Sequence, residues 1–208
     1  MTLKPWHKSL ILAALSIASA VLAYVSLSQP WYHFDDWQSS DFSGSTWGQE
    51  YKFYLNEWTH SFYHNETISQ LNTFTYHGPS YFWVPLEPIH SFMNTIEMLV
   101  VLSIVLAVLV AALAMIRFQN TQLIASAASV ALFASVPIAF FLGIVDAVNE
   151  TDFPFLDELT GFIGDETASS YSSDTTVVWG PMSSWWLMIV ACAVQFAGLV
   201  FAFRLRKK

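Results

Sequence analysis

Four long apolar segments divide the chain, and each has the length that a transmembrane helix needs. About 20 apolar residues in a helix cross a hydrocarbon layer roughly 30 Å thick. The pattern predicts membrane spans at residues 9–29, 93–116, 122–145 and 182–203. The polar segments around and between them are residues 1–8, 30–92, 117–121, 146–181 and 204–208. The predicted fold class is therefore a mainly α-helical membrane protein with a bundle of four transmembrane helices.

The second and third spans form the clearest part of this pattern. Only residues 117–121 separate them, so the two helices must lie antiparallel as a hairpin. The composition agrees, because 54% of the residues are hydrophobic and only 12% are charged. Soluble domains carry about 25% charged residues. The chain is therefore expected to have lipid around most of its helical surface.

The charged residues predict how the spans are oriented. Positive residues near spans mark the cytoplasmic side of a membrane. All basic residues except Lys52 fall in the two terminal segments or the hairpin joint: Lys4, Lys8, Arg117, Arg204, Arg206, Lys207 and Lys208. Every acidic residue except Glu97 falls in segments 30–92 and 146–181. We therefore expect a multipass protein of the cell (plasma) membrane with cytoplasmic termini and two extracellular loops.

The first span has an alternative interpretation as a secretory signal peptide. Lys4 and Lys8 precede an apolar core, and Ala18–Ala20 is a small-residue stretch of the kind found at cleavage sites. The apolar run continues beyond Ala20, which favours a retained span. Cleavage would leave three spans in the same orientation.

The two extracellular loops are predicted to fold. Loop 30–92 contains eighteen Phe, Tyr and Trp residues, whereas disordered segments contain few aromatic residues. Strands are predicted at Asn72–His77, at Tyr81–Val84 after a turn at residues 78–80, and at Thr175–Trp179. For Tyr51–Tyr63, the pattern favours neither a helix nor a strand.

Small and flexible residues predict turns in the second loop, at Gly161, at Gly164 and across Ser169–Ser173. The strands of the two loops are expected to meet in one sheet. The fold prediction is thus a four-helix bundle with a small extracellular β-containing cap formed by both loops.

Several residues inside the spans bear on helix packing. Pro137 is expected to kink the third span, and Gln195 is the one amide deep in a span and is expected to form an interhelical hydrogen bond. Glu97 follows Asn94 and is interpreted as a helix cap. Small residues four positions apart predict close helix contacts or self-association: Ala14/Ala18, Ser16/Ala20, Ser19/Ala23, Ala107/Ala111, Ala127/Ala131/Ser135/Ala139 and Ala193/Ala197.

Histidines supply the candidate metal ligands of the chain. Five of the six lie in the first loop, and His60 and His64 would share one face of a helix. Together with His33 they form a possible copper or zinc site. Solvated or locally hydrogen-bonded histidines are the alternative, because no close ligand motif such as HExxH is present. We expect no other cofactor.

Other chemistry is limited by what the sequence contains. Cys192 is the only cysteine, so an internal disulfide is excluded. No nucleotide-binding glycine loop and no GxSxG motif occurs, and the negative net charge of −8 disfavours nucleic acid as a partner. We therefore expect no enzymatic activity. Asn65 and Asn149 each begin an N-glycosylation sequon in an extracellular loop.

The layout resembles that of the claudin-like tetraspan membrane proteins. The shared features are cytoplasmic ends, a larger first outer loop, a smaller second one, a short inner turn, and the Pro30-Trp31 and Trp47-Gly48 pairs early in the first loop. The paired loop cysteines and the Gly-Leu-Trp signature of that family are missing. The resemblance implies a shared architecture, that of a tetraspan scaffold with a folded extracellular cap, and little about activity.

Three functional hypotheses follow. The first is a non-enzymatic membrane protein whose folded cap contacts a partner protein, a second copy or the cell envelope. The second is an accessory subunit of a membrane enzyme or transporter, with a metal at the extracellular histidines. The third is a channel or transporter that uses Pro137 and Gln195.

Overall fold

The structure is a computed structural model that describes residues 5–40, 45–65, 67–76, 86–116, 119–151, 159–170 and 173–206. The chain divides into two compact units. The helical unit comprises Met1–Ser28, Thr95–Phe140 and Ser184–Lys208, and the sheet unit comprises Gln29–Asn94 and Phe141–Ser183. Each unit is described below by itself.

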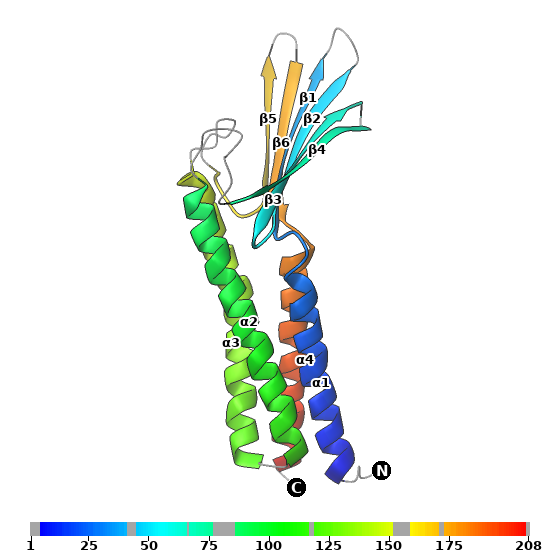
Figure 1. Cartoon of the computed structure of the whole chain (residues 1–208), viewed down its shortest axis with the longest axis vertical. Coiled ribbons are helices and arrows are strands. Elements are labelled where there is room, and N and C mark those ends of the chain that lie inside the picture. The colour runs from blue at the N-terminus through cyan, green and yellow to red at the C-terminus, as the bar shows by residue number, and fades with distance from the viewer. Residues whose placement is uncertain are drawn as a thin grey trace. The chain divides into compact units, whose positions relative to one another are not determined.

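Four α-helices account for the apolar segments (Figure 1). They are α1 (Pro5–Ser26), α2 (Glu87–Ile116), α3 (Gln119–Asn149) and α4 (Ser183–Arg206). All four are long and apolar enough to cross a membrane, which confirms the prediction of four candidate spans. Helix α2 begins well before residue 93, and α3 continues past residue 145, so the ends of both helices belong to the sheet unit.

The interpretation of Glu97 as a helix cap was wrong. Helix α2 begins at Glu87, so Glu97 lies in its third turn, where backbone N–H groups already have helical partners. Glu87 is the acidic residue of the first turn, where a negative side chain is favourable beside the helix dipole. Pro88 follows it in a turn that needs no donor from it.

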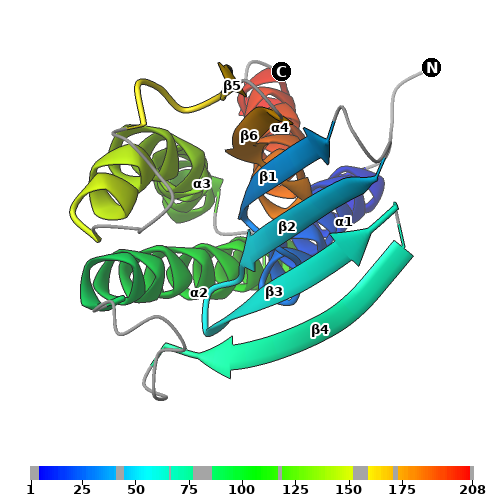
Figure 2. The same cartoon turned by 90° about the horizontal axis from the view of Figure 1, so that it is seen from above.

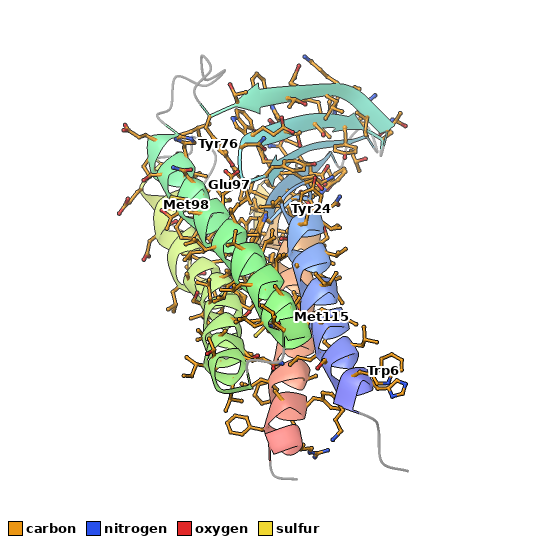
Figure 3. All side chains as sticks on the ribbon, turned by 60° about the horizontal axis from the view of Figure 1, so that its bottom comes forward. Trp6, Tyr24, Tyr76, Glu97, Met98 and Met115 are labelled. Atoms are coloured by element: carbon orange, nitrogen blue, oxygen red, sulfur yellow. The ribbon has the colours of Figure 1, made fainter. Side chains whose placement is uncertain are left out.

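The helical unit places polar side chains inside and large apolar side chains outside. Ser16, Ser129 and Gln195 are at most 1% exposed. Tyr24, Met98 and Met115 are 69%, 61% and 58% exposed, and Figure 3 shows them on the helices. Water would penalise this arrangement, whereas lipid favours it, because hydrocarbon solvates apolar side chains and not hydroxyl or amide groups.

Some of the small-residue pairs on the helices are buried inside the chain, and others are exposed on its surface. The pairs Ser16/Ala20, Ser19/Ala23 and Ala107/Ala111 are buried inside the chain, as expected for close helix contacts. The pairs Ala14/Ala18, Ala127/Ala131 and Ala193/Ala197 are exposed. Spacing alone therefore did not separate the packing pairs from those on the outer surface.

Helices α1 and α4 lie antiparallel and close together. Ser184 Oγ donates to the carbonyl oxygen of Ser26, 2.8 Å away. At the other end of the pair, a Cβ added at Gly198 would lie 3.2 Å from Leu12 Cδ1. Trp185 Nε1 also donates to the carbonyl oxygen of Pro137 at 3.1 Å, which connects α4 to α3.

Six antiparallel strands form one sheet in the order β4-β3-β2-β1-β6-β5. They are β1 (Tyr32–Ser40), β2 (Thr46–Phe53), β3 (Glu57–His64), β4 (Thr67–Thr75), β5 (Gly164–Ser170) and β6 (Ser173–Pro181). Figure 2 shows β4, β3, β2 and β1 side by side. Since β1–β4 come from the first loop and β5 and β6 from the second, the prediction of a sheet shared by both loops is confirmed.

The individual strand predictions had mixed outcomes. Thr175–Trp179 lies in β6, and most of Asn72–His77 lies in β4. Tyr51–Tyr63, left undecided, forms the β2–β3 hairpin, closed by a bond from Tyr54 N to Glu57 O. Tyr81–Val84 and the turn before it lie outside the described residues. The sequence missed β1 altogether.

One of the predicted turns was wrong, because Gly164 begins β5. In the predicted turn Ser169–Ser173, Ser170 pairs with Ser173, so the chain reverses between β5 and β6 within this stretch. Gly164 is required in β5 by its neighbour across the strands, because an added Cβ would lie 2.3 Å from the ring of Trp179. The glycine signal therefore marked a ring lying over a strand and not a turn.

Gly48 has the same relation to Trp37 on the neighbouring strand. The two residues are directly paired across β1 and β2, and a Cβ at Gly48 would lie 2.4 Å from the Trp37 ring. The ring covers the glycine and packs 5.3 Å from the ring of Tyr63 on β3. Gly48 is thus the residue that lets three strands share one aromatic contact.

We predict that Gly48→Ala destabilises the sheet unit by about 1–3 kcal/mol, because the methyl group must displace the Trp37 ring. Thermal unfolding of the purified protein in detergent, followed by tryptophan fluorescence, measures the change. Gly161→Ala is the matched control, since its Cβ would meet no atom closer than 3.8 Å. Equal effects of the two substitutions would contradict this packing argument.

Candidate functional site

One face of the sheet gathers most of its aromatic side chains. Successive residues of a strand point to opposite faces, and directly paired residues share a face. Phe34 is paired with Tyr51 and Trp179, and Tyr51 with His60, which defines this side. We call it the aromatic face, and its rings are Tyr32, Phe34, Trp47, Tyr51, Phe53, Trp58, His60, Phe62, His64, Phe74 and Trp179.

The rings of the aromatic face pack in rows across the strands. Tyr51 and His60 stack with centroids 4.4 Å apart and planes only 8° from parallel. His60 also contacts Phe62 at 4.1 Å, and Trp58 stacks on Phe74 at 4.5 Å. These distances are those of favourable aromatic pairs. The face therefore has a rigid floor of rings.

Gln49 is the hydrogen-bonding centre of this floor. Its Oε1 accepts a hydrogen bond from Tyr51 Oη at 2.9 Å and one from His60 Nε2 at 3.0 Å. The amide oxygen carries no proton, so His60 must hold a proton on Nε2. The three side chains thereby keep one arrangement among the rings of this face.

His60 is buried in its neutral form. None of its surface is exposed, and burial lowers the pKa of its imidazole to about 4. The cause is the loss of water around the charged form. Burial likewise raises the pKa of Tyr51, and the carboxylate of Asp36 raises it further.

Asp36 places a carboxylate on the aromatic face. It lies directly across from Gln49 and is only 8% exposed. Its Oδ1 has no hydrogen-bond partner among the described residues, and burial raises the pKa of the carboxyl group. A carboxylate in this position is costly to desolvate unless something neutralises it.

A pocket of about 490 Å³ opens beside Asp36. It lies over β1–β4, the strands seen side by side in Figure 2. Its lining combines rings, side-chain amides and one carboxylate: Asp36, Gln38, Trp47, Gly48, Gln49, Phe62, Tyr63, Ser69 and Gln70. The volume is in the range of pockets that hold small molecules, about 300–1,000 Å³. We call it the sheet pocket.

The opposite face of the sheet carries more polar side chains, and we call it the polar face. Glu50 Oε1 accepts from Lys52 Nζ at 2.7 Å, and its Oε2 accepts from Tyr63 Oη at 2.7 Å. Tyr63 has its pKa raised to about 12, by burial first and then by Glu50. Lys52 is therefore already paired, on the side of the sheet away from Asp36.

The structure does not bring the three histidines of the predicted metal site together. His33 lies on the polar face, with Nδ1 3.1 Å from Asp35 Oδ2. His60 and His64 share the aromatic face, but on a strand four residues span roughly 13 Å. His64 stacks on Trp47 at 4.2 Å. Among the described residues no group of three metal-binding side chains occurs.

The two asparagines of the sequons have structural roles. Asn65 adopts a left-handed backbone conformation with φ of 47°, and its Oδ1 accepts from Thr46 N at 3.1 Å. Asn149 Nδ2 donates to Leu159 O at 3.1 Å, and its Oδ1 accepts from Leu159 N at 2.8 Å. A glycan on Asn149 would replace one of the two Nδ2 hydrogens beside the contact with Leu159, whereas Asn65 is exposed. Glycosylation stays a prediction for both.

The two predicted span residues are both buried in the helical unit. Pro137 lies within a continuous α3, and its carbonyl oxygen accepts from Trp185. Gln195 is 1% exposed, and its Oε1 has no hydrogen-bond partner among the described residues. The expected interhelical bond of Gln195 and the kink at Pro137 stay predictions.

Other buried polar side chains lie at the same depth in the bundle as Gln195. The Ser26–Ser184 and Leu12–Gly198 contacts set the register of α1 and α4, which places Gln195 level with Ser16. The Pro137–Trp185 bond places it level with residues 126–129 of α3. Ser16, Ser126 and Ser129 are also buried hydroxyls without a hydrogen-bond partner in the described part of the chain.

The residues of the sheet pocket were not found from the sequence. Asp36, Gln38 and Gln49 looked like ordinary polar residues of a loop, because β1 was not predicted. The available signal was the alternation of Tyr32, Phe34 and Asp36 along one side of a strand. That alternation places Asp36 on a buried face only once β2 and β6 are known to flank β1.

We predict that the sheet unit loses stability as the pH falls from about 6.5 to about 4. In this window His60 is protonated in the unfolded chain but stays neutral in the folded chain, because its folded pKa is about 4. The free energy of unfolding therefore falls by up to about 3 kcal/mol. Asp36 acts in the opposite direction, since its raised pKa lets the folded state take up a proton first.

The comparison of two variants isolates the histidine. His60→Phe should lose most of the acid-dependent drop in unfolding midpoint measured between pH 7 and 4. His64→Phe, on the exposed end of the same strand, should keep it. A drop that persists in His60→Phe would show that another group causes it.

Comparison with known proteins leaves the function to be argued from the structure. No protein-family model matches the chain, and no curated protein matches it. The likeness to claudin-like tetraspan proteins therefore remains a resemblance of layout. The features that bear on function are the four apolar helices, the sheet pocket and the exposed edges of the sheet.

Proposed function

We propose that the chain is a non-enzymatic multipass protein of the plasma membrane that associates with a second copy of itself through β4. In this proposal the helices anchor the protein in the bilayer with both termini in the cytoplasm. The sheet unit lies outside the cell and carries the contact surface. The observation that carries the proposal is the uncharged, exposed edge strand β4.

The anchoring role is supported by two independent features. The helical unit exposes large apolar side chains and buries hydroxyls and an amide, which suits lipid as its surroundings. Seven of the eight basic residues flank the spans on one side, and the acidic residues gather in the two loops. The second feature gives the proposed orientation.

Among the residues that the structure describes, strand β4 is an edge of the sheet that is open to further pairing. It forms one end of the strand order, and seven of its nine residues are exposed. The sequence Thr67–Thr75 (TISQLNTFT) contains no charge and no proline. Edge strands in proteins usually carry charged residues or proline, which prevent another strand from pairing with their unpaired N–H and C=O groups.

The side chains beside this edge add apolar contact area. Ile68 and Leu71 are 54% and 61% exposed. Ile68 is paired with Tyr63 and Leu71 with Ser61, so both lie on the polar face of the sheet, at its rim. Tyr63 continues the apolar surface to Trp37. A strand added at β4 would cover Ile68 and Leu71.

The opposite edge of the sheet is protected. Strand β5 carries Asp165 and Glu166, and both are exposed. Negative side chains at an edge repel a second negative strand. The two edges therefore differ in the way expected if only β4 is used for contact.

A second copy of the chain is the partner that fits this edge. The protein has a net charge of −8, so most contacts between two copies would bring like charges together. Strand β4 is the neutral exception, and two copies of it can pair antiparallel about a twofold axis with no charge opposite a charge. Each copy would then contribute the same surface.

We predict that residues 119 and 165 lie on opposite sides of the membrane. In a Cys192→Ser background, Asp165→Cys should react with a membrane-impermeant maleimide in intact cells. Gln119→Cys should react only after the cells are opened. Labelling of both positions in intact cells would refute the four-span orientation on which the proposal rests.

We predict that Leu71→Lys weakens self-association by about tenfold or more. A lysine at this position puts a charge opposite the partner strand and removes apolar contact. Light scattering in mild detergent gives the mass of the protein, and cross-linking in membranes before solubilisation tests the contact in lipid.

Thr167→Lys is the matched control, because it places the same charge on the exposed strand β5. It should leave the mass unchanged. A wild-type protein that is monomeric in both assays would overturn the proposal, and so would dimers that Leu71→Lys does not affect. A different chain that copurifies in fixed ratio would assign the edge to that partner instead.

A further inference from the structure

The sheet pocket has a chemistry that the β4 contact does not use. From it we propose that the pocket binds a small organic ammonium ion, with Asp36 as its counter-charge. The amide oxygens of Gln38 and Gln70 supply hydrogen-bond acceptors, and Trp47 and Phe62 receive the apolar part of the ligand. This inference does not rest on self-association through β4.

The carboxylate of Asp36 is the first argument for a cation. Asp36 is 8% exposed, lines the pocket, and has an oxygen without a hydrogen-bond partner in the described residues. The part of the lining that the structure describes contains no lysine, arginine or histidine side chain. Lys52 is held by Glu50 on the other face. A buried carboxylate is stabilised when a cation enters beside it.

The rings of the pocket are the second argument. Trp47 is 56% exposed, and its contact with His64 at 4.2 Å holds the indole in place at the pocket rim. Phe62 contacts the ring of His60, its neighbour on the same face of β3, with centroids 4.1 Å apart. Aromatic faces attract ammonium groups and pack against hydrocarbon, so they suit a ligand with both.

The amide oxygens are the third argument, because they can accept a hydrogen bond from an ammonium group. The oxygen of Gln49 already accepts from Tyr51 and His60, while Gln38 lies on β1 and Gln70 on β4. An ammonium group can donate to Asp36 and to an amide oxygen together. An anion would meet the carboxylate of Asp36 without any positive side chain to offset it.

The size and the surroundings of the pocket agree with such a ligand. A volume of about 490 Å³ accepts a molecule the size of a ring with a short side chain. The acidic residues of the two loops, fifteen of the sixteen in the chain, create a negative potential that concentrates cations near the sheet.

Three probes of similar shape and different charge test the proposal. Phenethylammonium, phenethyl alcohol and phenylacetate are titrated calorimetrically into the full-length protein in detergent at neutral pH, with titrations into empty micelles subtracted. We expect saturable binding of phenethylammonium alone. Equal binding of the alcohol would show that the carboxylate is not recognised. Absence of saturable phenethylammonium binding up to about 1 mM would overturn the proposal.

Two variants assign the binding to the pocket. Asp36→Asn keeps the shape and removes the charge, and it should weaken phenethylammonium binding by about tenfold or more. Asp165→Asn removes an exposed acid from β5 and should leave the affinity unchanged. Equal affinities for the two variants would overturn the role of Asp36.

Trp47→Ala provides a test that does not depend on the folding of Asp36→Asn. Trp47 is exposed at the rim, so its removal should leave the thermal unfolding midpoint nearly unchanged while weakening phenethylammonium binding by about threefold or more. An unchanged affinity in Trp47→Ala would place the ligand elsewhere. Leu71→Lys should bind the probe as the wild type does, which separates this result from that on self-association.

Discussion

The pairing of β1 with β6 is the contact on which the sheet unit depends. It joins residues that are far apart in the chain, from Tyr32 opposite Pro181 to Ser40 opposite Ser173. Without it, the first loop would form a four-stranded sheet and the second an isolated hairpin, which is marginal in water. With it, β1 becomes an inner strand with neighbours on both sides. Asp36 and Tyr32 are buried for that reason.

The aromatic face shows how polar groups are kept in an otherwise apolar layer. Tyr51 and His60 satisfy each other through the single oxygen of Gln49, and their stacking excludes the water that would compete for it. Asp36, one strand away, lacks such a partner for Oδ1 in the described residues. The same sheet thus contains a hydrogen-bonded group of side chains beside a buried carboxylate, and that carboxylate lines the sheet pocket.

The helical unit distributes its side chains in the opposite way, with large apolar residues outside and polar residues inside. Its surface holds the large apolar side chains, and its interior holds serines, small residues and Gln195. Packing is achieved by close approach, as at Gly198 against Leu12, and by bonds to main-chain carbonyls, as from Ser184 to Ser26. Such contacts suit an environment in which lipid removes the hydrophobic gain of helix association. Trp185 belongs to this set, since its indole nitrogen donates a hydrogen bond to the carbonyl oxygen of Pro137.

The sequence by itself determined the four apolar helices, because hydrocarbon thickness and backbone hydrogen bonding leave a segment of that length and composition little choice. It also predicted that the two aromatic loops fold and that their strands belong to one sheet. Only the tertiary structure decided which faces those strands present. The side-chain alternation of β1 and the glycines at 48 and 164 acquire their meaning from neighbours across the sheet. The sheet pocket, the separation of His33 from His60 and the open edge at β4 all follow from strand order and register, which are set by contacts between distant residues and leave no local pattern in the sequence.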